Sequence, residues 1–248
     1  MTAQLRAELL KQRTAGTNLG LLAAMFGLVL LAVLLHGLGL NAEVVDGTSE
    51  QLMTLGRGEF LAALFAALLG ALSITSEVRH GTIRPTFLVT PRRGRIVAAK
   101  IWASTLIGAG FGLVAGALAA GVGTAALRAR GIDVQLDGGD YALLLAGGTA
   151  AAALWAAIGV GLGAVIRNQV PAVVGICAWL LFVEGLLVGD VADIADIGRF
   201  APGALGEGLS GQNPATLLDP ALSAFLLAIY AAAIATAGWL ATTRRDVT

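Results

Sequence analysis

The chain contains six runs of mostly apolar residues, each near the length of about 20 residues that an α-helix needs to cross a bilayer. The runs are continuous and do not alternate in polarity, so helices are expected and the strands of a membrane barrel are not. The expected spans are residues 19–40, 59–76, 101–126, 141–166, 170–188 and 221–241. The sequence therefore predicts an all-α integral membrane protein, with residues 1–248 forming a single transmembrane domain.

Composition excludes several other classes of protein. Of the 248 residues, 57% are hydrophobic and 13% are charged, whereas a soluble domain carries about 25% charged residues. A mean hydropathy of +0.82 leaves too little polar surface to cover a water-soluble core of this size. We therefore exclude a soluble enzyme, a disordered tail and a nucleic-acid-binding protein.

Lysine and arginine set the expected orientation, because short loops rich in these residues stay in the cytoplasm. If both termini are cytoplasmic and six spans alternate, 12 of the 16 basic residues are cytoplasmic, and six of those lie within residues 77–100. The opposite orientation would place those 12 residues outside. We expect a multi-pass protein of the plasma (inner) membrane, and the high Ala and Gly content suggests a bacterial one with a GC-rich genome.

Residues 1–18 are expected to form an amphipathic helix that lies along the cytoplasmic membrane surface. Leu5, Leu9 and Leu10 gather on one face, and polar residues surround the rest of the helix. The alternative is a basic flank that only sets topology.

The segment 77–100 between the second and third spans is the most distinctive loop. It carries six basic residues and one acidic residue, yet it also holds apolar residues that a loop with a purely topological role does not need. Pro85 suits the first turn of a short helix and Pro91 would end it. We expect a short helix across the cytoplasmic membrane face, with Ile83, Phe87 and Leu88 available to another protein.

Two further patterns concern the spans and the outer side. Segment 189–220 is acidic and has an apolar periodicity, which favours short interfacial helices over free coil. Gly108, Gly112 and Gly116, and likewise Gly159 and Gly163, recur at four-residue spacing within spans, which predicts close helix packing rather than a phosphate site.

No catalytic or metal motif stands out in the sequence. A phosphate-binding loop of the form G-x-x-x-x-G-K-[ST] is missing. One cysteine and two histidines argue against a disulfide framework and a His/Cys metal cluster. We therefore expect a chain that is not an enzyme by itself and that holds no cofactor of its own.

Glu184 and His36 are ionisable residues that lie within the expected spans, near their outer ends. Glu184 belongs to the fifth span and His36 to the first. An ionisable residue in a membrane span is a candidate pathway residue, and solvation at the membrane interface is the alternative at this shallow depth.

The 77–100 segment also carries a resemblance to a known family. Glu77 at the end of a span, the run Arg79-His80-Gly81-Thr82-Ile83-Arg84, then Thr90-Pro91-Arg92-Arg93 and Lys100 resemble the signature of ABC type-2 exporter permeases. The run Arg6 to Thr14 resembles that family's membrane-surface helix, and the six-span layout is similar. The motifs cover about 35 residues, whereas the topology covers the whole chain.

The resemblance implies a translocation pathway between two permease chains, identical or different, with a separate ATPase subunit beneath each. ATP and Mg²⁺ would be bound by the two ATPase copies. The coupling residues would be Glu77, Arg79, Gly81, Thr82, Ile83, Arg84, Phe87, Leu88, Pro91, Arg92 and Arg93, with Glu77 bonded to the loop backbone or to an arginine. The exported substrate would be amphipathic or hydrophobic, such as a drug, lipid or peptide.

Three alternatives remain open from the sequence. The basic loop would also suit topology and anionic lipid binding alone. The whole chain would also suit a non-transporting scaffold or sensor subunit, or a channel or ion-coupled carrier. The last of these normally needs several buried charges, and the sequence shows none at mid-membrane.

Overall fold

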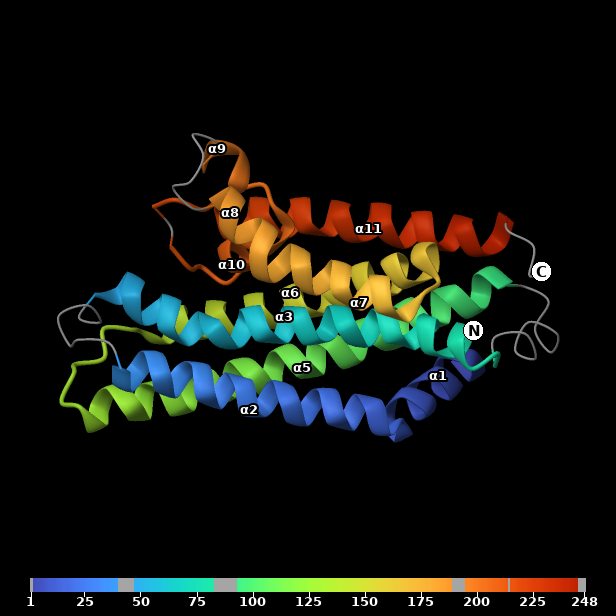
Figure 1. The fold of residues 1–248 in the computed structure, drawn as a ribbon. Coiled ribbons are helices and arrows are strands. Elements are labelled where there is room, and N and C mark those ends of the chain that lie inside the picture. The colour runs from blue at the N-terminus through green and yellow to red at the C-terminus, as the bar shows by residue number, and fades with distance from the viewer. Residues whose placement is uncertain (1, 40–46, 83–92, 189–194, 214, 245–248) are drawn as a thin grey trace.

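A computed structural model describes residues 2–39, 47–82, 93–188, 195–213 and 215–244. This part of the chain is helical throughout and contains no strand. Six of its helical segments are long and apolar enough to cross a membrane, which indicates a multi-pass membrane protein. The spans run roughly parallel in one bundle, and both termini lie at the same end, which we call the terminal end (Figure 1).

Ten α-helices and one π-helical segment build the described part of the chain. The spans are α2 (Gly16–Gly39), α3 (Thr48–Arg79), α5 (Arg93–Ala129), α6 (Gly138–Ile166), a fifth span made of α7 (Gln169–Ala178), the π-helical η2 (Trp179–Val183) and α8 (Glu184–Val188), and α11 (Pro220–Arg244). The helices outside the spans are α1 (Thr2–Thr14), α9 (Ala195–Gly198) and α10 (Pro202–Leu209).

Several helices are longer than their apolar runs. Helix α3 starts at Thr48 rather than at residue 59, and α5 starts at Arg93 rather than at residue 101. Helices α3 and α5 therefore extend into the polar segments beyond the predicted spans. A helix continues past its apolar run where its polar side chains find partners, as Gln51 does with the backbone of Asp133 and Gln135.

Helices α3 and α6 form the centre of the bundle, with an apolar core on each side of the pair. One core joins them to α2 and α5, through residues such as Val29 and Phe111. The other core joins them to α7, α10 and α11, through residues such as Ile176, Leu205 and Leu227. Helices α2, α7 and α11 are largely exposed at the periphery, as expected of helices that face lipid.

The predicted glycine rows lie at helix contacts. A Cβ atom on Gly108 or Gly112 of α5 would come within 2.8 Å of backbone oxygens of α6. A Cβ on Gly159 of α6 would lie 2.0 Å from the Ala67 oxygen of α3, and one on Gly163 would lie 2.7 Å from the Ala71 oxygen. These contacts confirm the packing interpretation, because only glycine lets the backbones approach so closely.

The short helices α1 and α10 pack on the bundle in different ways. The face of α1 that packs on the bundle is polar, since Glu8 and Gln12 are its buried residues and Leu10 is exposed. Segment 189–220 does contain short helices, but α10 is packed against α3, α6 and α11 with Leu205 fully buried. Glycines permit this insertion, because a Cβ on Gly147 of α6 would lie 2.3 Å from the Leu209 oxygen.

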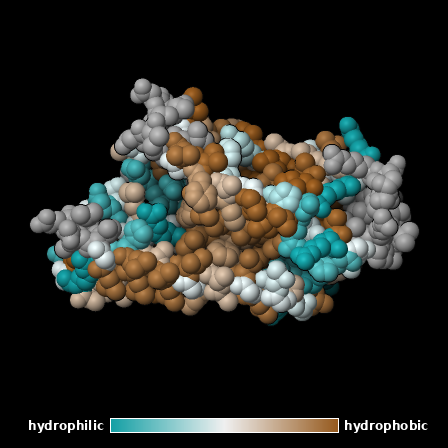
Figure 2. All heavy atoms as spheres, viewed as in Figure 1, coloured by the Kyte–Doolittle hydropathy of each residue, from teal (hydrophilic) through white to brown (hydrophobic). Residues whose placement is uncertain are grey.

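The surface has polar ends and an apolar middle. In Figure 2 hydrophobic side chains cover most of the middle of the visible face, and hydrophilic side chains gather toward the two ends. Such a belt matches the apolar interior of a bilayer with polar groups at both boundaries.

The close contact of α3 and α6 predicts a position-dependent effect of a single methyl group. Gly159→Ala is expected to lower the free energy of unfolding by about 2–3 kcal/mol, because its Cβ would overlap the Ala67 oxygen. Gly110→Ala is the matched control, since a Cβ there meets nothing within 4 Å, and alanine favours the helix. Thermal unfolding in detergent measures both, and equal midpoints for the two variants would contradict the packing interpretation.

Candidate functional site

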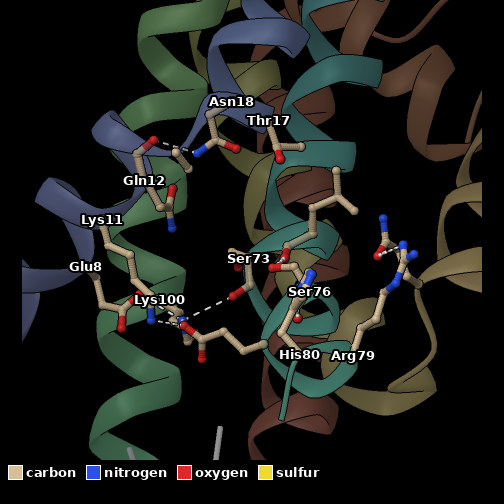
Figure 3. Close-up of a pocket in the computed structure, with 14 residues that line it drawn as sticks. Glu8, Lys11, Gln12, Thr17, Asn18, Ser73, Ser76, Arg79, His80 and Lys100 are labelled. Carbon is tan, nitrogen blue, oxygen red and sulfur yellow. Dashed lines mark hydrogen bonds and ion pairs between the residues drawn. The ribbon is translucent and has the colours of Figure 1, made fainter. Parts of the chain in front are cut away.

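The two lysines of the chain meet in one cluster at the terminal end. Lys100 Nζ of α5 lies 2.8 Å from Glu8 Oε2 of α1 and 2.8 Å from Glu77 Oε1 of α3. It also donates to the Ser73 backbone oxygen at 3.1 Å, and Lys11 of α1 pairs with Glu77 Oε1. Figure 3 shows Glu8, Lys11 and Lys100 converging from α1 and α5. We call Glu8, Lys11, Glu77 and Lys100 the terminal ion-pair cluster.

Burial makes this cluster a strong structural constraint. The Lys100 side chain is only 2% exposed, so its charge is tolerable only with carboxylates and carbonyl oxygens around it. Its two carboxylate partners come from different helices, α1 and α3. The pairing therefore fixes α1, α3 and α5 relative to one another near the end of α3 and the start of α5.

Further hydrogen bonds join helices at the same end. They run from Gln12 Nε2 to Ser104 Oγ (2.9 Å), from Trp239 Nε1 to the Gly94 oxygen (3.2 Å), and from Arg79 to Gln169 Oε1 (3.2 Å). They connect α1 with α5, α11 with α5, and α3 with α7. The terminal end is thus cross-linked across five helices.

The residues expected to couple to an ATPase are only partly described. Glu77 is in α3 rather than in a loop, and among the described residues its carboxylate pairs with Lys11 and Lys100. Arg79 is the last residue of α3, Gly81 has a positive φ of 69°, and the Thr82 hydroxyl donates to the Glu77 backbone oxygen. Arg93 begins α5. Ile83, Arg84, Phe87, Leu88, Pro91 and Arg92 lie outside the described residues.

A second polar group lies at the opposite end of the bundle. Glu59 of α3 is 3% exposed, and Glu184 of the fifth span is 6% exposed. Glu184 accepts hydrogen bonds from Trp179 Nε1 and from the backbone N–H of Gly203, which lies 2.9 Å away. The alternative that Glu184 is solvated at the membrane interface gains no support from this arrangement, because the side chain is buried and hydrogen-bonded within the protein. Together with Glu207 of α10, these residues form what we call the opposite acidic cluster.

The negative charges of the opposite acidic cluster are only partly compensated by neighbouring groups. Glu207 repels both Glu59 and Glu184, while Arg57 attracts Glu207 and Gln212 Nε2 donates to Glu59 at 3.3 Å. A cavity of about 380 Å³ borders the cluster and is lined by Arg57, Phe60, Leu180, Glu184, Gly185, Ala204 and Glu207. Carboxylates beside a cavity can carry a proton or attract a cationic group. The described residues contain no His/Cys/Asp/Glu group able to hold a metal ion.

The hydrogen bond of His36 is local to α2 and does not involve the opposite acidic cluster. The His36 Nδ1 lies 2.9 Å from the Ala32 oxygen, one turn earlier in α2. The hydrogen bonds of Glu184 run instead to Trp179 and Gly203. The two pathway candidates of the sequence are thus engaged in separate local hydrogen bonds.

Comparisons with known proteins add no family to this picture. No family model matches the chain, and no curated protein matches it at a significant level.

The terminal ion-pair cluster predicts very different effects for the two lysines. Lys100→Met is expected to lower the free energy of unfolding by about 3–5 kcal/mol, because it leaves buried carboxylates uncompensated. Lys11→Met is the control and should cost about 1 kcal/mol or less, because the Lys11 side chain is 50% exposed. Thermal unfolding of the purified variants distinguishes them. An equal decrease in unfolding free energy for Lys100→Met and Lys11→Met would show that Lys100 is not the centre of the cluster.

Glu207 predicts a pH-dependent stability. Burial raises the pKa of Glu207 above its ordinary value, and Arg57 only partly opposes this. The folded state therefore favours the protonated carboxyl, and that contribution to stability is lost as pH rises through the raised pKa. Glu207→Gln should raise the unfolding temperature at pH 8, and the gain should vanish below about pH 4. A gain of equal size at both pH values would contradict this account.

Proposed function

We propose that this chain is the membrane subunit of an ABC exporter, paired with a second permease chain and driven by a separate ATPase beneath each. The observation that supports it most is the terminal ion-pair cluster at the base of segment 80–92. Glu77 and Lys100 stand on either side of that segment, and they are bonded to each other and to α1. A force applied to the segment would thus reach α1, α3 and α5 together.

The charge distribution supports the same assignment. Placing the terminal end in the cytoplasm follows the rule for lysine and arginine. Segment 80–92 then faces the cytoplasm with one histidine, two arginines and the apolar residues Ile83, Phe87 and Leu88. A short coupling helix with such residues suits a groove on an ATPase lined by acidic side chains. Helix α1 would lie at the cytoplasmic membrane surface.

The apolar walls of the bundle favour a hydrophobic or amphipathic substrate, such as a drug, lipid or peptide. A cavity of about 390 Å³ borders α6, α7 and α11, and its aromatic lining residues are Trp155, Trp179 and Tyr230. The indole N–H of Trp155 has no acceptor among the described residues. Apolar cavities with a few polar groups are typical of small-molecule sites.

The opposite acidic cluster favours a second candidate function, an ion-coupled carrier. Glu59 and Glu184 are buried carboxylates within spans, and buried charges are what an ion-coupled carrier normally needs. Proton-driven transport in liposomes without nucleotide would support the carrier. Transport that requires ATP and the ATPase subunit would support the exporter.

The exporter proposal predicts a stable complex with an ATPase. The full chain, purified in mild detergent from its own cells, should retain a P-loop ATPase detectable by mass spectrometry. Phe87→Asp and Arg84→Glu should reduce recovery of that ATPase at least about tenfold, because each disrupts the proposed contact. Arg128→Glu, an exposed arginine at the far end of α5, is the matched control and should leave recovery unchanged. Undiminished recovery with both loop variants would refute the coupling role of the segment.

A further inference from the structure

The terminal ion-pair cluster forms one wall of a cavity. The proposed exporter function gives this cavity no role. The cavity encloses about 240 Å³ among α1, the start of α2, the end of α3 and Lys100 of α5. A water molecule in liquid occupies about 30 Å³, so there is room for a ligand group of several atoms. Figure 3 shows Gln12, Asn18, Ser73 and Arg79 around this space.

Two residues of its lining each carry a buried acceptor atom that has no donor among the described residues. These atoms are Gln12 Oε1 and Glu77 Oε2, each in a side chain that belongs to a residue 5% exposed. The other polar atom of each side chain is engaged, since Gln12 Nε2 donates to Ser104 and Glu77 Oε1 accepts from both lysines. Buried acceptors nearly always have a partner. The vacant acceptors point to a ligand that donates N–H groups.

The same cavity also offers a positive charge. Within the cluster, Glu8 and Glu77 balance Lys11 and Lys100. Arg79 also lines the cavity, is exposed, and bonds to the uncharged amide of Gln169. The lining therefore presents two unpaired acceptors together with one uncompensated guanidinium. A zwitterion with an amine and an anionic oxygen group is complementary to both.

An apolar groove continues from the cavity. It encloses about 480 Å³ and shares Gln12 and Asn18 with the polar cavity. Leu9, Leu19, Leu22, Ile107 and Phe111 supply its walls from α1, α2 and α5. A polar cavity joined to an apolar groove at one end of a membrane bundle matches a molecule with a headgroup and an acyl chain.

We propose that this is a binding site for an aminophospholipid of the phosphatidylethanolamine type. Its ammonium group donates to Glu77 Oε2 and Gln12 Oε1, its phosphate lies beside Arg79, and one acyl chain lies in the groove. The site does not depend on the exporter assignment, because it is built only from contacts within this chain. The bound lipid would complete the hydrogen bonding of the elbow between α1 and α2.

Lipid retention by the full chain tests this site directly. The detergent-purified protein is mixed with phosphatidylethanolamine, phosphatidylcholine or phosphatidylglycerol with identical acyl chains and examined by native mass spectrometry. Phosphatidylethanolamine should be retained about tenfold more than phosphatidylcholine, which has the same net charge but no N–H donors. Equal retention of these two lipids, or a preference for phosphatidylglycerol, would overturn the proposal.

Variants locate the preference within the cavity. Gln12→Leu removes one acceptor and should abolish most of the preference for phosphatidylethanolamine over phosphatidylcholine. Ser104→Ala is the matched control, because it removes the same interhelical hydrogen bond and keeps Gln12 Oε1. An unchanged preference in Gln12→Leu would overturn the assignment. Soluble glycerophosphoethanolamine should compete poorly, and competition as strong as that of the lipid would show that the groove holds no acyl chain.

Discussion

The buried ammonium of Lys100 is the constraint on which the terminal end of the bundle depends. A charge so far from water must be surrounded by acceptors, and Glu8, Glu77 and the Ser73 oxygen supply them from α1 and α3. Satisfying one side chain therefore places α1 against the bundle, holds the end of α3 and the start of α5 together, and leaves the second oxygen of Glu77 without a donor among the described residues. Glu77 thus belongs both to the ion pairs that hold this end together and to the proposed lipid site.

The two polar clusters differ in how far their charges are compensated. The terminal ion-pair cluster contains equal numbers of carboxylates and ammonium groups, linked by direct contacts. The opposite acidic cluster has three carboxylates and relies on Arg57 and on neutral donors such as Trp179. One end of the bundle is therefore fixed by attraction, whereas the other holds like charges close together beside a cavity.

The six spans and their close packing could be predicted because each depends on a local pattern. An apolar run of span length indicates a membrane-spanning helix, and glycines at four-residue spacing indicate a close helix contact. Neither inference depends on which helices become neighbours. The ion pair between Glu77 and Lys100 could not be predicted, because hydropathy ends the apolar runs at these residues and so assigns them to a loop. Glu59, at the start of the second run, was missed in the same way, since its burial depends on α10 folding over it.

The insertion of α10 has a consequence for the order in which the protein is assembled. Leu205 and Leu209 are buried by α3 and α6 on one side and by α11 on the other. The last of these helices is also the last to emerge from the ribosome. The segment between the fifth and sixth spans therefore waits, with its apolar residues uncovered, until the final span enters the membrane. Glu207 is part of α10, so the opposite acidic cluster is completed only when α10 takes its final position.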